Sequence, residues 1–573
     1  MTEWILPKTP DSKLVDSLSQ SINVNEVLAS ILVNRGVSSF ESAKAFFRPD
    51  LEQLHDPFLM HDMDKAVERL THAIANNEKI LVYGDYDVDG TTSVALVFGF
   101  LSEIHSEIDF YIPNRYTEGY GLSKEGVDWA YEKEFGLIIT LDCGIKANEN
   151  IKKAKDYGID VIVCDHHNPP ENLPEAYAIL DPKKKQCNYP YKELSGCGVG
   201  FKLLHAFCMQ QGVEEAKLFE FIDLLAVSIA ADIVPITGEN RILTYHGLKK
   251  LAKSQHKIGL HSLIRSTGME GTFTVSDVVF KIAPRINAAG RMEHAKTAVE
   301  LLICCDPEEA LNLSQKINGQ NSSRREIDTG ITEEILEQIS SDEKLVHSKT
   351  TVLYNENWNK GVIGIAASRS IEKYYRPTII LTKSGDKATG SARSVEGFDI
   401  HSAIEKCADL LDQFGGHKYA AGMTLPIENI PLLQEKFEVV VSESLTEEHI
   451  RPKIQIDAEI NLDHINYKFF NILKQMEPFG PGNMTPVFLS RNCYVKGHIN
   501  VIKEKHLKFM AKQSGGSAGF QCLAFNMLSI MPEMEEHQHF DMAYTIEENN
   551  FRGERSLQLY VKDVKFNSST QSE

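Results

Sequence analysis

Three aspartates stand at alternate positions within the stretch LVYGDYDVDG, which spans residues 81–90. They are Asp85, Asp87 and Asp89, and they follow directly on an apolar run. Carboxylates this close repel one another, so the repulsion either raises a pKa or requires a compensating cation. A solvated surface loop can carry such a cluster by chance, and this short stretch does not exclude that interpretation. The alternative is that the carboxylates hold a metal ion.

Further potential ligands follow apolar runs later in the chain. Asp142 ends the run in GLIITLDCG, and Asp165, His166 and His167 end the run in DVIVCDHH. Asp232 closes the apolar run FIDLLAVSIAADIVP, where a helix cap is the alternative interpretation of a lone aspartate. Ligands that are rich in oxygen, with one or two imidazoles, suit Mn²⁺ or Mg²⁺ better than a metal selected by thiolates.

The elements that would position these groups alternate regularly from Lys79 onward. Apolar strand candidates at 79–85, 108–113, 136–144 and 160–167 are separated by stretches of helical length. This rhythm indicates βαβ units and a mainly parallel sheet, in which ligands bind at the carboxyl ends of the strands. The candidate residues stand at those ends, so we expect them to converge on one edge of the sheet.

The number of carboxylates predicts how many ions they would hold. Four or five carboxylates are too many for a single divalent ion, whereas two ions bridged by a shared carboxylate would balance the charge. Two such metals serve an in-line attack on phosphorus, because one generates hydroxide and both stabilise the attacking and leaving oxygens. The sequence therefore predicts a site for Mn²⁺ or Mg²⁺, with two ions, and hydrolysis of a phosphoester.

Composition limits the class of protein. The 573 residues suffice for roughly three to five domains, and 42% hydrophobic residues can build ordinary cores. The net charge of -20 argues against a wholly basic surface for nucleic acid, although a local basic groove remains compatible with it. The 10 cysteines include no CxxC pair, which indicates a reduced cytoplasm. Since neither a signal peptide nor an apolar run of membrane-spanning length is present, we expect a cytoplasmic protein with no membrane partner.

Nine motifs in a fixed order carry a resemblance to a known family. DYDVDG, LDCG, DHH and the Asp232-Ile-Val triplet resemble the DHH phosphoesterase superfamily. Five further motifs resemble those of the RecJ family, the bacterial exonucleases specific for single-stranded DNA. They are NRYTEGYGL (114–122), GCGVGFKL (196–203), RINAAGRM (285–292), GSARS (390–394) and FGGHKYAAGM (414–423). The resemblance spans most of the chain, from residue 60 to residue 525.

This resemblance implies a metal-dependent 5′→3′ exonuclease that hydrolyses single-stranded DNA to mononucleotides in DNA repair and recombination. It also implies a RecQ-type helicase and a single-strand-binding protein as partners. A second hypothesis is a DHH phosphodiesterase for short oligoribonucleotides, cyclic dinucleotides or pyrophosphate, and a third is a binding protein with a degenerate site. The chain length and a strand-holding barrel favour the first hypothesis, and the intact acidic set argues against the third.

The resemblance assigns roles to residues as well. The catalytic residues would be Asp142, His166 and His167. The metal ligands would be Asp85, Asp87, Asp89, Asp142, His166 and Asp232, with Asp142 as the bridging carboxylate. The substrate-binding residues would be Arg115, His167, Arg285, Asn287, Arg291, Ser391, Arg393 and His417. Many members of the family have His where this chain has Tyr83, so we expect Asp85 to take over coordination there.

Three of these residues, Arg115, Ser391 and Arg393, would bind the terminal 5′-phosphate, and Asp165 would orient the neighbouring imidazole. Alternatives stay open for the arginines. The segment with Arg285 and Arg291 can be a helix entry with exposed arginines, and Arg393 can pair with a structural carboxylate.

The fold class that follows is α/β. A parallel-sheet DHH domain is joined by a long helix to a DHH-associated α/β domain, and a C-terminal OB-like β-barrel follows. The expected segments are 1–60 (helical), 61–265 (DHH domain), 266–345 (interdomain, with the long helix), 346–447 (DHH-associated domain), 448–566 (OB-like barrel) and 567–573 (disordered tail). Such barrels bind single strands through their own basic and aromatic side chains. The candidates here are Lys496, Lys505, Lys508 and Phe525. The alternative is that the barrel only braces the other domains.

Overall fold

The computed structural model describes residues 2–253, 257–446 and 448–566. It divides into two compact units, one formed by Leu54–Pro452 and the other by the two ends of the chain, up to Gln53 and from Lys453. The predicted disordered tail at 567–573 lies outside the described residues. In the part of the chain that the structure describes, no helix is both long enough and apolar enough to cross a membrane.

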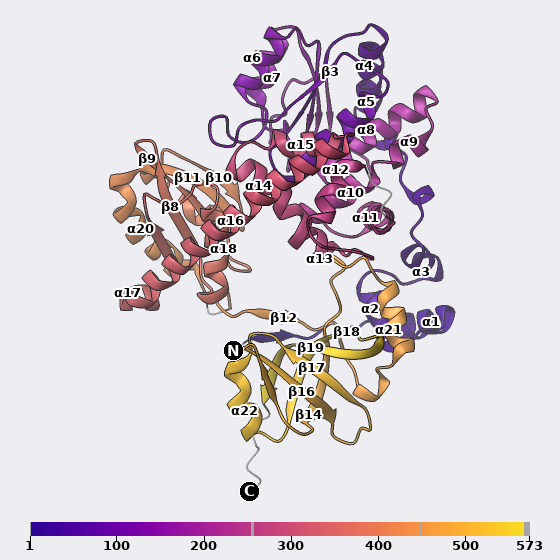
Figure 1. Cartoon of the computed structure of the whole chain (residues 1–573), viewed down its shortest axis with the longest axis vertical. Helices are drawn as coiled ribbons and strands as arrows, with labels where there is room; N and C mark the ends of the chain where they lie inside the picture. Colours follow the sequence, from indigo (N-terminus) through magenta and orange to yellow (C-terminus); the bar gives the residue numbers. More distant parts are fainter. Residues whose placement is uncertain (1, 254–256, 447, 567–573) are drawn as a thin grey trace. The chain divides into compact units, whose positions relative to one another are not determined.

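The larger unit begins with a five-stranded parallel sheet in the order β3-β2-β4-β5-β6 (Figure 1). Its strands are β2 (Ile80–Gly84), β3 (Ile108–Tyr111), β4 (Leu137–Leu141), β5 (Asp160–Cys164) and β6 (Ala178–Leu180). The parallel sheet and its first four strands are thus confirmed. The sequence analysis missed β6, because three residues are too short to show a pattern.

Helices cover both faces of this sheet. On one face, Leu81 and Tyr83 of β2 share an apolar cluster with Ala130 of α6 (Lys124–Glu132) and Ile151 of α7 (Asn148–Asp156). On the other face, α5 (Val88–Leu101) packs against α8 (Gly196–Gln211) and α10 (Ile222–Ala231). The helices α5 and α10 are apolar all round because they are buried on nearly every side.

The remaining helices of this part flank these layers (Figure 1). They are α4 (Met63–Ala75), α9 (Glu215–Phe219), α11 (Gly238–Ala252), α12 (Ile258–Arg265), α13 (Val275–Asp277), α14 (Ala283–Met292) and α15 (Lys296–Ile303).

The strand order creates a place for a ligand. After β2 the chain adds β3 on one side of that strand and then β4 on the other, so the order reverses between β2 and β4. The carboxyl ends of strands at such a switch point border a crevice that parallel α/β sheets use for binding. The loop after β2 carries Asp85 and Asp87, the first turn of the following helix carries Asp89, and the loop after β4 carries Asp142.

A long helix, α16 (Pro307–Ser341), connects this sheet to a second one, as predicted. The side chain of Asp306 caps it by accepting a hydrogen bond from the backbone N–H of Glu309, and Pro307 occupies the first turn, where no N–H is needed. The second sheet has the order β10-β11-β9-β8-β7.

The DHH-associated part mixes strands and helices, and two pairs of strands, β8 with β9 and β10 with β11, follow one another directly. The elements are α17 (Glu343–His347), β7 (Thr351–Tyr354), α18 (Ile363–Lys373), β8 (Thr378–Ser384), β9 (Lys387–Arg393), α19 (Ile400–Glu405), β10 (Gln413–His417), β11 (Ala420–Pro426) and α20 (Ile430–Ser444).

The smaller unit contains a closed barrel, which confirms the OB-like fold. Its strands are β14 (Phe488–Val495), β15 (Asn500–Ile502), β16 (His506–Gln513), β17 (Gly519–Ala524), β18 (Phe540–Phe551) and β19 (Glu554–Phe566). They follow the order β14-β18-β19-β17-β16-β15, and an additional pairing of β14 with β16 closes the ring. The strands β12 (Lys453–Gln455) and β13 (Ala458–Glu459) and the helices α21 (Tyr467–Gln475) and α22 (Met531–Glu536) complete it.

The N-terminal helices belong to the same unit as this barrel. The strand β1 (Glu3–Ile5) pairs in parallel with β12, and α1 (Ser12–Ile22), α2 (Glu26–Asn34) and α3 (Phe40–Phe47) lie beside the barrel (Figure 1). Leu28 and Ile31 of α2 share one apolar core with Phe488 and Tyr544 of the barrel. The domain boundaries of the sequence analysis stay predictions, but the two ends of the chain clearly fold together.

Candidate metal centre

The DYDVDG motif forms the loop after β2 and the start of α5. Asp87 is the N-cap of α5, since its side chain accepts a hydrogen bond from the backbone N–H of Gly90 at 3.1 Å. A Cβ atom at Gly90 would lie only 2.3 Å from the carbonyl oxygen of Asp85, so the loop can close only around glycine. The alternating aspartates therefore come from a tight strand-to-helix turn, and Asp85 is buried inside it.

Asp89, in the first turn of α5, is held by a second helix. Its carboxylate accepts hydrogen bonds from the backbone N–H groups of Gly196 at 2.6 Å and Cys197 at 2.9 Å, which open α8. The hydroxyl of Ser228, from α10, donates a third at 2.7 Å. A helix N-terminus stabilises a buried carboxylate charge, so α8 fixes Asp89 in place.

Asp142 follows β4 in a left-handed conformation, with φ 59. A Cβ atom at Gly196 would lie 2.5 Å from the Cβ atom of Asp142, so the start of α8 packs directly on it. A non-glycine residue in this conformation is strained, and such strain concentrates at functional sites.

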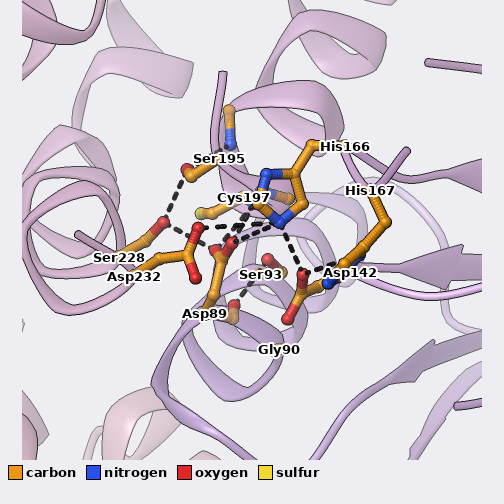
Figure 2. A network of polar contacts seen from close by, with 12 residues as sticks. Asp89, Gly90, Ser93, Asp142, His166, His167, Ser195, Cys197, Ser228 and Asp232 are labelled. Atoms are coloured by element: carbon orange, nitrogen blue, oxygen red, sulfur yellow. Dashed lines mark hydrogen bonds and ion pairs between the residues drawn. The ribbon is translucent and has the colours of Figure 1, made fainter. Parts of the chain in front are cut away.

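His166, at the end of β5, joins the carboxylates (Figure 2). Its Nε2 atom lies 3.1 Å from Asp142 Oδ1, 3.6 Å from Asp232 Oδ2 and 3.8 Å from Asp89 Oδ2. Two overlapping groups result, each with ligand atoms within 4.8 Å of one another and able to hold a metal ion. They are Asp142, His166 and His167, and Asp89, His166 and Asp232.

The electrostatics of the cluster call for a cation. Burial and the neighbouring Asp89 raise the pKa of Asp142, and the same two causes raise the pKa of Asp232 to about 9. Burial lowers the pKa of His166, which keeps the imidazole neutral. A divalent ion binds the neutral imidazole directly, and it replaces the protons that the repelling carboxylates would otherwise carry.

Atoms without partners support the same conclusion. Asp85 Oδ2 and both ring nitrogens of His166 are buried, and none of them has a hydrogen-bond partner among the described residues. Buried polar atoms are almost always satisfied, so these atoms fit a bound ion or its water. The donor set, carboxylate oxygens with imidazole, suits Mn²⁺ or Mg²⁺.

His167 is held differently from its neighbour. Its Nδ1 atom lies 2.7 Å from Asp165 Oδ1, and its Nε2 atom lies 3.2 Å from the hydroxyl of Tyr120. Burial alone would raise the pKa of Asp165, but the bond to His167 and its charge hold that pKa at about 2. Burial opposes a charge on His167, but the bond to Asp165 raises its pKa overall, which favours the imidazolium form.

The hydroxyl of Tyr83 bonds to Gly121 and Ser123 rather than to a carboxylate. It donates a hydrogen bond to the carbonyl of Gly121 at 2.9 Å, and the ring of Tyr83 stacks on Tyr111 at 5.3 Å. Asp85 accepts from the backbone N–H of Gly121 at 3.3 Å, and neither Asp85 nor Asp87 enters the two potential metal groups. Whether Asp85 coordinates in place of the usual His stays a prediction.

Three of the predicted substrate-binding arginines gather in one cluster. Burial, together with the nearby Arg115, Arg324 and Arg393, lowers the pKa of Arg291 to about 9. Arg291 donates to the carbonyl of Gly361 at 2.8 Å. Among the described residues, Arg115, Arg291 and Arg393 form no ion pair with a carboxylate, in contrast to Arg324 and its neighbour Asp328.

The remaining predicted residues lie in different surroundings. Arg393 donates to the hydroxyl of Ser391 at 2.9 Å, next to the arginine cluster. Arg285 points instead to α16, where it donates to Asn318 Oδ1 at 2.7 Å, and Asn287 is half-buried on α14. Partial burial and the nearby Lys146 and His167 lower the pKa of His417, on β10.

The sequence analysis missed residues that support the site. Ser228 and Ser195 bond to each other at 2.7 Å, and Ser228 bonds to Asp89, but nothing in an apolar helical run signals this. Tyr120 and Gly196 stand inside quoted motifs, and a glycine before an apolar helix is the one available signal of a close approach.

Comparison with known proteins agrees with the geometry. The DHH family, N-terminal domain, matches residues 79–229, the DHHA1 domain matches 344–443 and the RecJ OB domain matches 456–563. The single-stranded-DNA-specific exonuclease RecJ of Bacillus subtilis is 36% identical over 559 residues, which is 97% of this chain and 70% of that protein. The chain belongs to the RecJ family.

Other RecJ proteins extend this result. The RecJ exonuclease of Escherichia coli is 34% identical over 528 residues, which is 88% of this chain and 90% of that protein. The crystal structure of RecJ in complex with Mn²⁺ from Thermus thermophilus has a TM-score of 0.86 and 26% identity, and the similarity covers 99% of this chain and 80% of that one. The RecJ resemblance and the three-part fold expected from the sequence are thereby confirmed.

Proposed function

We propose that this protein is a metal-dependent exonuclease that degrades single-stranded DNA from its 5′ end to mononucleotides, in DNA repair and recombination. The observation that carries the proposal is the convergence of Asp89, Asp142, His166 and Asp232 at the switch point of the parallel sheet. Its membership of the RecJ family, whose named relatives act on single-stranded DNA, supports the substrate.

The two overlapping groups, which have His166 in common, support a site that would hold divalent ions. Asp142 belongs to one of these groups, 3.1 Å from the shared imidazole, and its bridging role is proposed from the family resemblance. Bound divalent ions would supply a hydroxide at neutral pH and stabilise the attacking and leaving oxygens. The first N–H group of α8 donates a hydrogen bond to the carboxylate of Asp89. Asp165 and Tyr120 orient the ring of His167 through hydrogen bonds to its two nitrogens. A positively charged His167 is suited to contact a phosphate oxygen of the strand.

The arginine cluster supports recognition of the strand's end. Half-buried guanidinium groups without carboxylate partners favour a bound anion, and guanidinium groups bind phosphate oxygens in pairs. We propose that Arg115, Ser391 and Arg393 bind the terminal 5′-phosphate, and that Arg291 contributes its charge. The alternative, in which Arg393 pairs with a structural carboxylate, finds no support among the described residues.

The barrel is proposed to hold the rest of the strand. Phe525 is exposed, and its ring contacts His506 at 5.2 Å and Tyr560 at 5.5 Å, while Lys508 lies on the adjacent β16. Aromatic and basic side chains of this kind bind single strands without reading sequence. A RecQ-type helicase and a single-strand-binding protein are proposed as partners, and the cytoplasm as the location, from the family resemblance.

One assay tests the function. The protein is incubated with Mn²⁺ and, in parallel, with 5′-labelled single-stranded DNA, duplex DNA, an oligoribonucleotide, a cyclic dinucleotide and pyrophosphate. We expect mononucleotides from the single strand and little reaction with the others. Faster hydrolysis of the oligoribonucleotide or the cyclic dinucleotide would favour the DHH phosphodiesterase alternative.

A further inference from the structure

Tyr86 lies between the metal loop and the arginine cluster. It stands between Asp85 and Asp87 in the sequence, and its ring lies against the guanidinium group of Arg115. The Cζ atom of Arg115 is 4.2 Å from the ring centroid, well within the range of a cation–π contact. The contact joins the loop after β2 to the loop after β3.

The other sides of Tyr86 touch further parts of the site. The ring of Tyr120 meets that of Tyr86 edge-on, at 6.3 Å and 84°. Tyr120 in turn donates to the backbone carbonyl of Asp142 at 2.9 Å. A Cβ atom at Gly290 would lie 3.0 Å from the carbonyl oxygen of Tyr86, so α14, which carries Arg291, packs against the same residue.

Besides Tyr86, the charges of Asp85 and Asp87 act on Arg115, and they attract it toward the metal loop. The Nε atom of Arg115 is buried and has no hydrogen-bond partner in the described part of the chain. A free arginine side chain has many rotamers, and ordering it on a ligand costs free energy unless another group restricts it beforehand. Tyr86 restricts it on one side, mainly through the face of its ring and also through a hydrogen bond of its hydroxyl.

We propose that Tyr86 is a positioning residue that holds Arg115 toward the terminal 5′-phosphate and ties that contact to the metal loop. The inference rests on the proposed function, in which Arg115 binds that phosphate. Because the backbone of Tyr86 belongs to the loop that carries Asp85 and Asp87, one residue sets the spacing between the anchored end and the scissile bond. That spacing determines the length of the first product.

The experiment compares Tyr86→Leu, which removes the ring, with Tyr86→Phe, which keeps it. Tyr131→Leu is the matched control, because Tyr131 stacks on Tyr157 at 4.2 Å, on α6. Affinity for 5′-phosphorylated and 5′-hydroxyl single strands is measured by fluorescence anisotropy in EDTA. Hydrolysis rates and product lengths on both strands are then measured with Mn²⁺.

We expect Tyr86→Leu to lower the preference for the phosphorylated strand by about three- to tenfold, both in affinity and in rate. Its first products should include a larger share of dinucleotides. Tyr86→Phe and the control should keep the preference and the mononucleotide product of the wild type. If Tyr86→Leu does not fold, Tyr86→Met serves as the ring-free variant.

Two outcomes would overturn the inference while leaving the proposed end recognition in place. In one, the ring-free variant keeps the wild-type preference and product length. In the other, it loses activity equally on both strands, which would mean that Tyr86 only supports the metal loop. A wild-type protein without any preference for the phosphate would instead overturn the proposed end recognition, and the inference with it.

Discussion

At the scale of single residues, the site is organised by charge that the fold has removed from water. Three carboxylates, Asp89, Asp142 and Asp232, meet around His166, and each comes from a different element of the chain. Burial raises the pKa of Asp142 and of Asp232. Such a cluster costs free energy unless cations offset the repulsion. The nearby arginine cluster concentrates positive charge instead, so a bound anion would offset its repulsion.

The variant Asp142→Asn tests whether a bound cation offsets the repulsion between the carboxylates. Losing a carboxylate from the group around His166 should weaken metal binding and lower kcat/KM at least about a hundredfold, or roughly 2.7 kcal/mol of barrier. It should also remove most of the rise in melting temperature that Mn²⁺ gives the wild type, since ion binding stabilises the folded state. Calorimetry with and without Mn²⁺ measures this rise.

Asp181→Asn is the matched control for that experiment. Asp181 is fully buried at the end of the next strand, β6, but it belongs to neither potential metal group. The Asp181→Asn protein should keep both the activity and the rise in melting temperature with Mn²⁺. An Asp142→Asn protein with more than about a tenth of the wild-type kcat/KM would contradict the bridging role of Asp142.

The variant Arg393→Ala tests whether the arginine cluster binds the terminal 5′-phosphate. Wild type should cut a 5′-phosphorylated strand faster than a 5′-hydroxyl strand, because a terminal phosphomonoester carries extra negative charge for the guanidinium groups. The variant should lose most of that ratio and still cut slowly. Arg265→Ala, at an exposed position on α12, should change nothing. Equal ratios in wild type and Arg393→Ala would show that Arg393 does not read the 5′ end.

At the scale of elements, α8 determines where two of the carboxylates lie. Its first N–H groups hold Asp89, and its first glycine leaves room for Asp142. The helix can approach this closely only because Gly196 has no side chain. One glycine in the motif GCGVG therefore positions carboxylates that come from two other segments of the chain.

Gly196→Ala should damage both stability and activity. The new Cβ atom would lie 2.5 Å from the Cβ atom of Asp142, so either α8 or Asp142 must move, at a cost of about 1–3 kcal/mol. Gly319→Ala on the exposed side of α16 meets nothing within 4 Å and should stabilise the protein by about 0.5–1 kcal/mol. Thermal unfolding and hydrolysis rates measure both effects. A fully active Gly196→Ala protein would contradict this account of α8.

At the scale of the whole molecule, the two ends of the chain form one unit. The side chain of Trp4 donates to Asp563 Oδ2 at 2.8 Å, and Arg35 pairs with Asp457 at 3.1 Å. Together with the shared apolar core, these contacts make the N-terminal helices part of the barrel's fold. Removing the barrel alone would expose the buried face of α2, including Leu28 and Ile31.

The fragment 54–452 should therefore behave better than the fragment 1–452. We expect 54–452 to stay soluble and to hydrolyse very short oligonucleotides, while 1–452 aggregates. Affinity of 54–452 should rise less with strand length than that of the full chain, because each base stacked on the barrel contributes about 1–3 kcal/mol. Equal length dependence in the two proteins would mean that the barrel only braces the molecule.

Much of the fold could be predicted from the sequence, because local pattern reports local structure. Apolar runs indicated four of the five parallel strands, and the acidic groups after three of them indicated the ends at which the aspartates stand. The barrel also followed from five short strand candidates separated by polar turns, and α16 from a long polar helical stretch that resembles the helix joining the two lobes of the family's core. The nine motifs, in their order, identified the family.

Tertiary structure decided what depends on contacts between distant segments. Only the packing of α8 and α10 on α5 shows that Asp89 is held by Gly196, Cys197 and Ser228 rather than by water. Only the folded chain shows that the Tyr83 hydroxyl bonds to the carbonyl of Gly121, whose N–H in turn bonds to Asp85. The N-terminal helices joined the barrel for the same reason: apolar residues on α2 fit a core whose other half lies more than 400 residues later, and no local pattern encodes which partner will cover such a face.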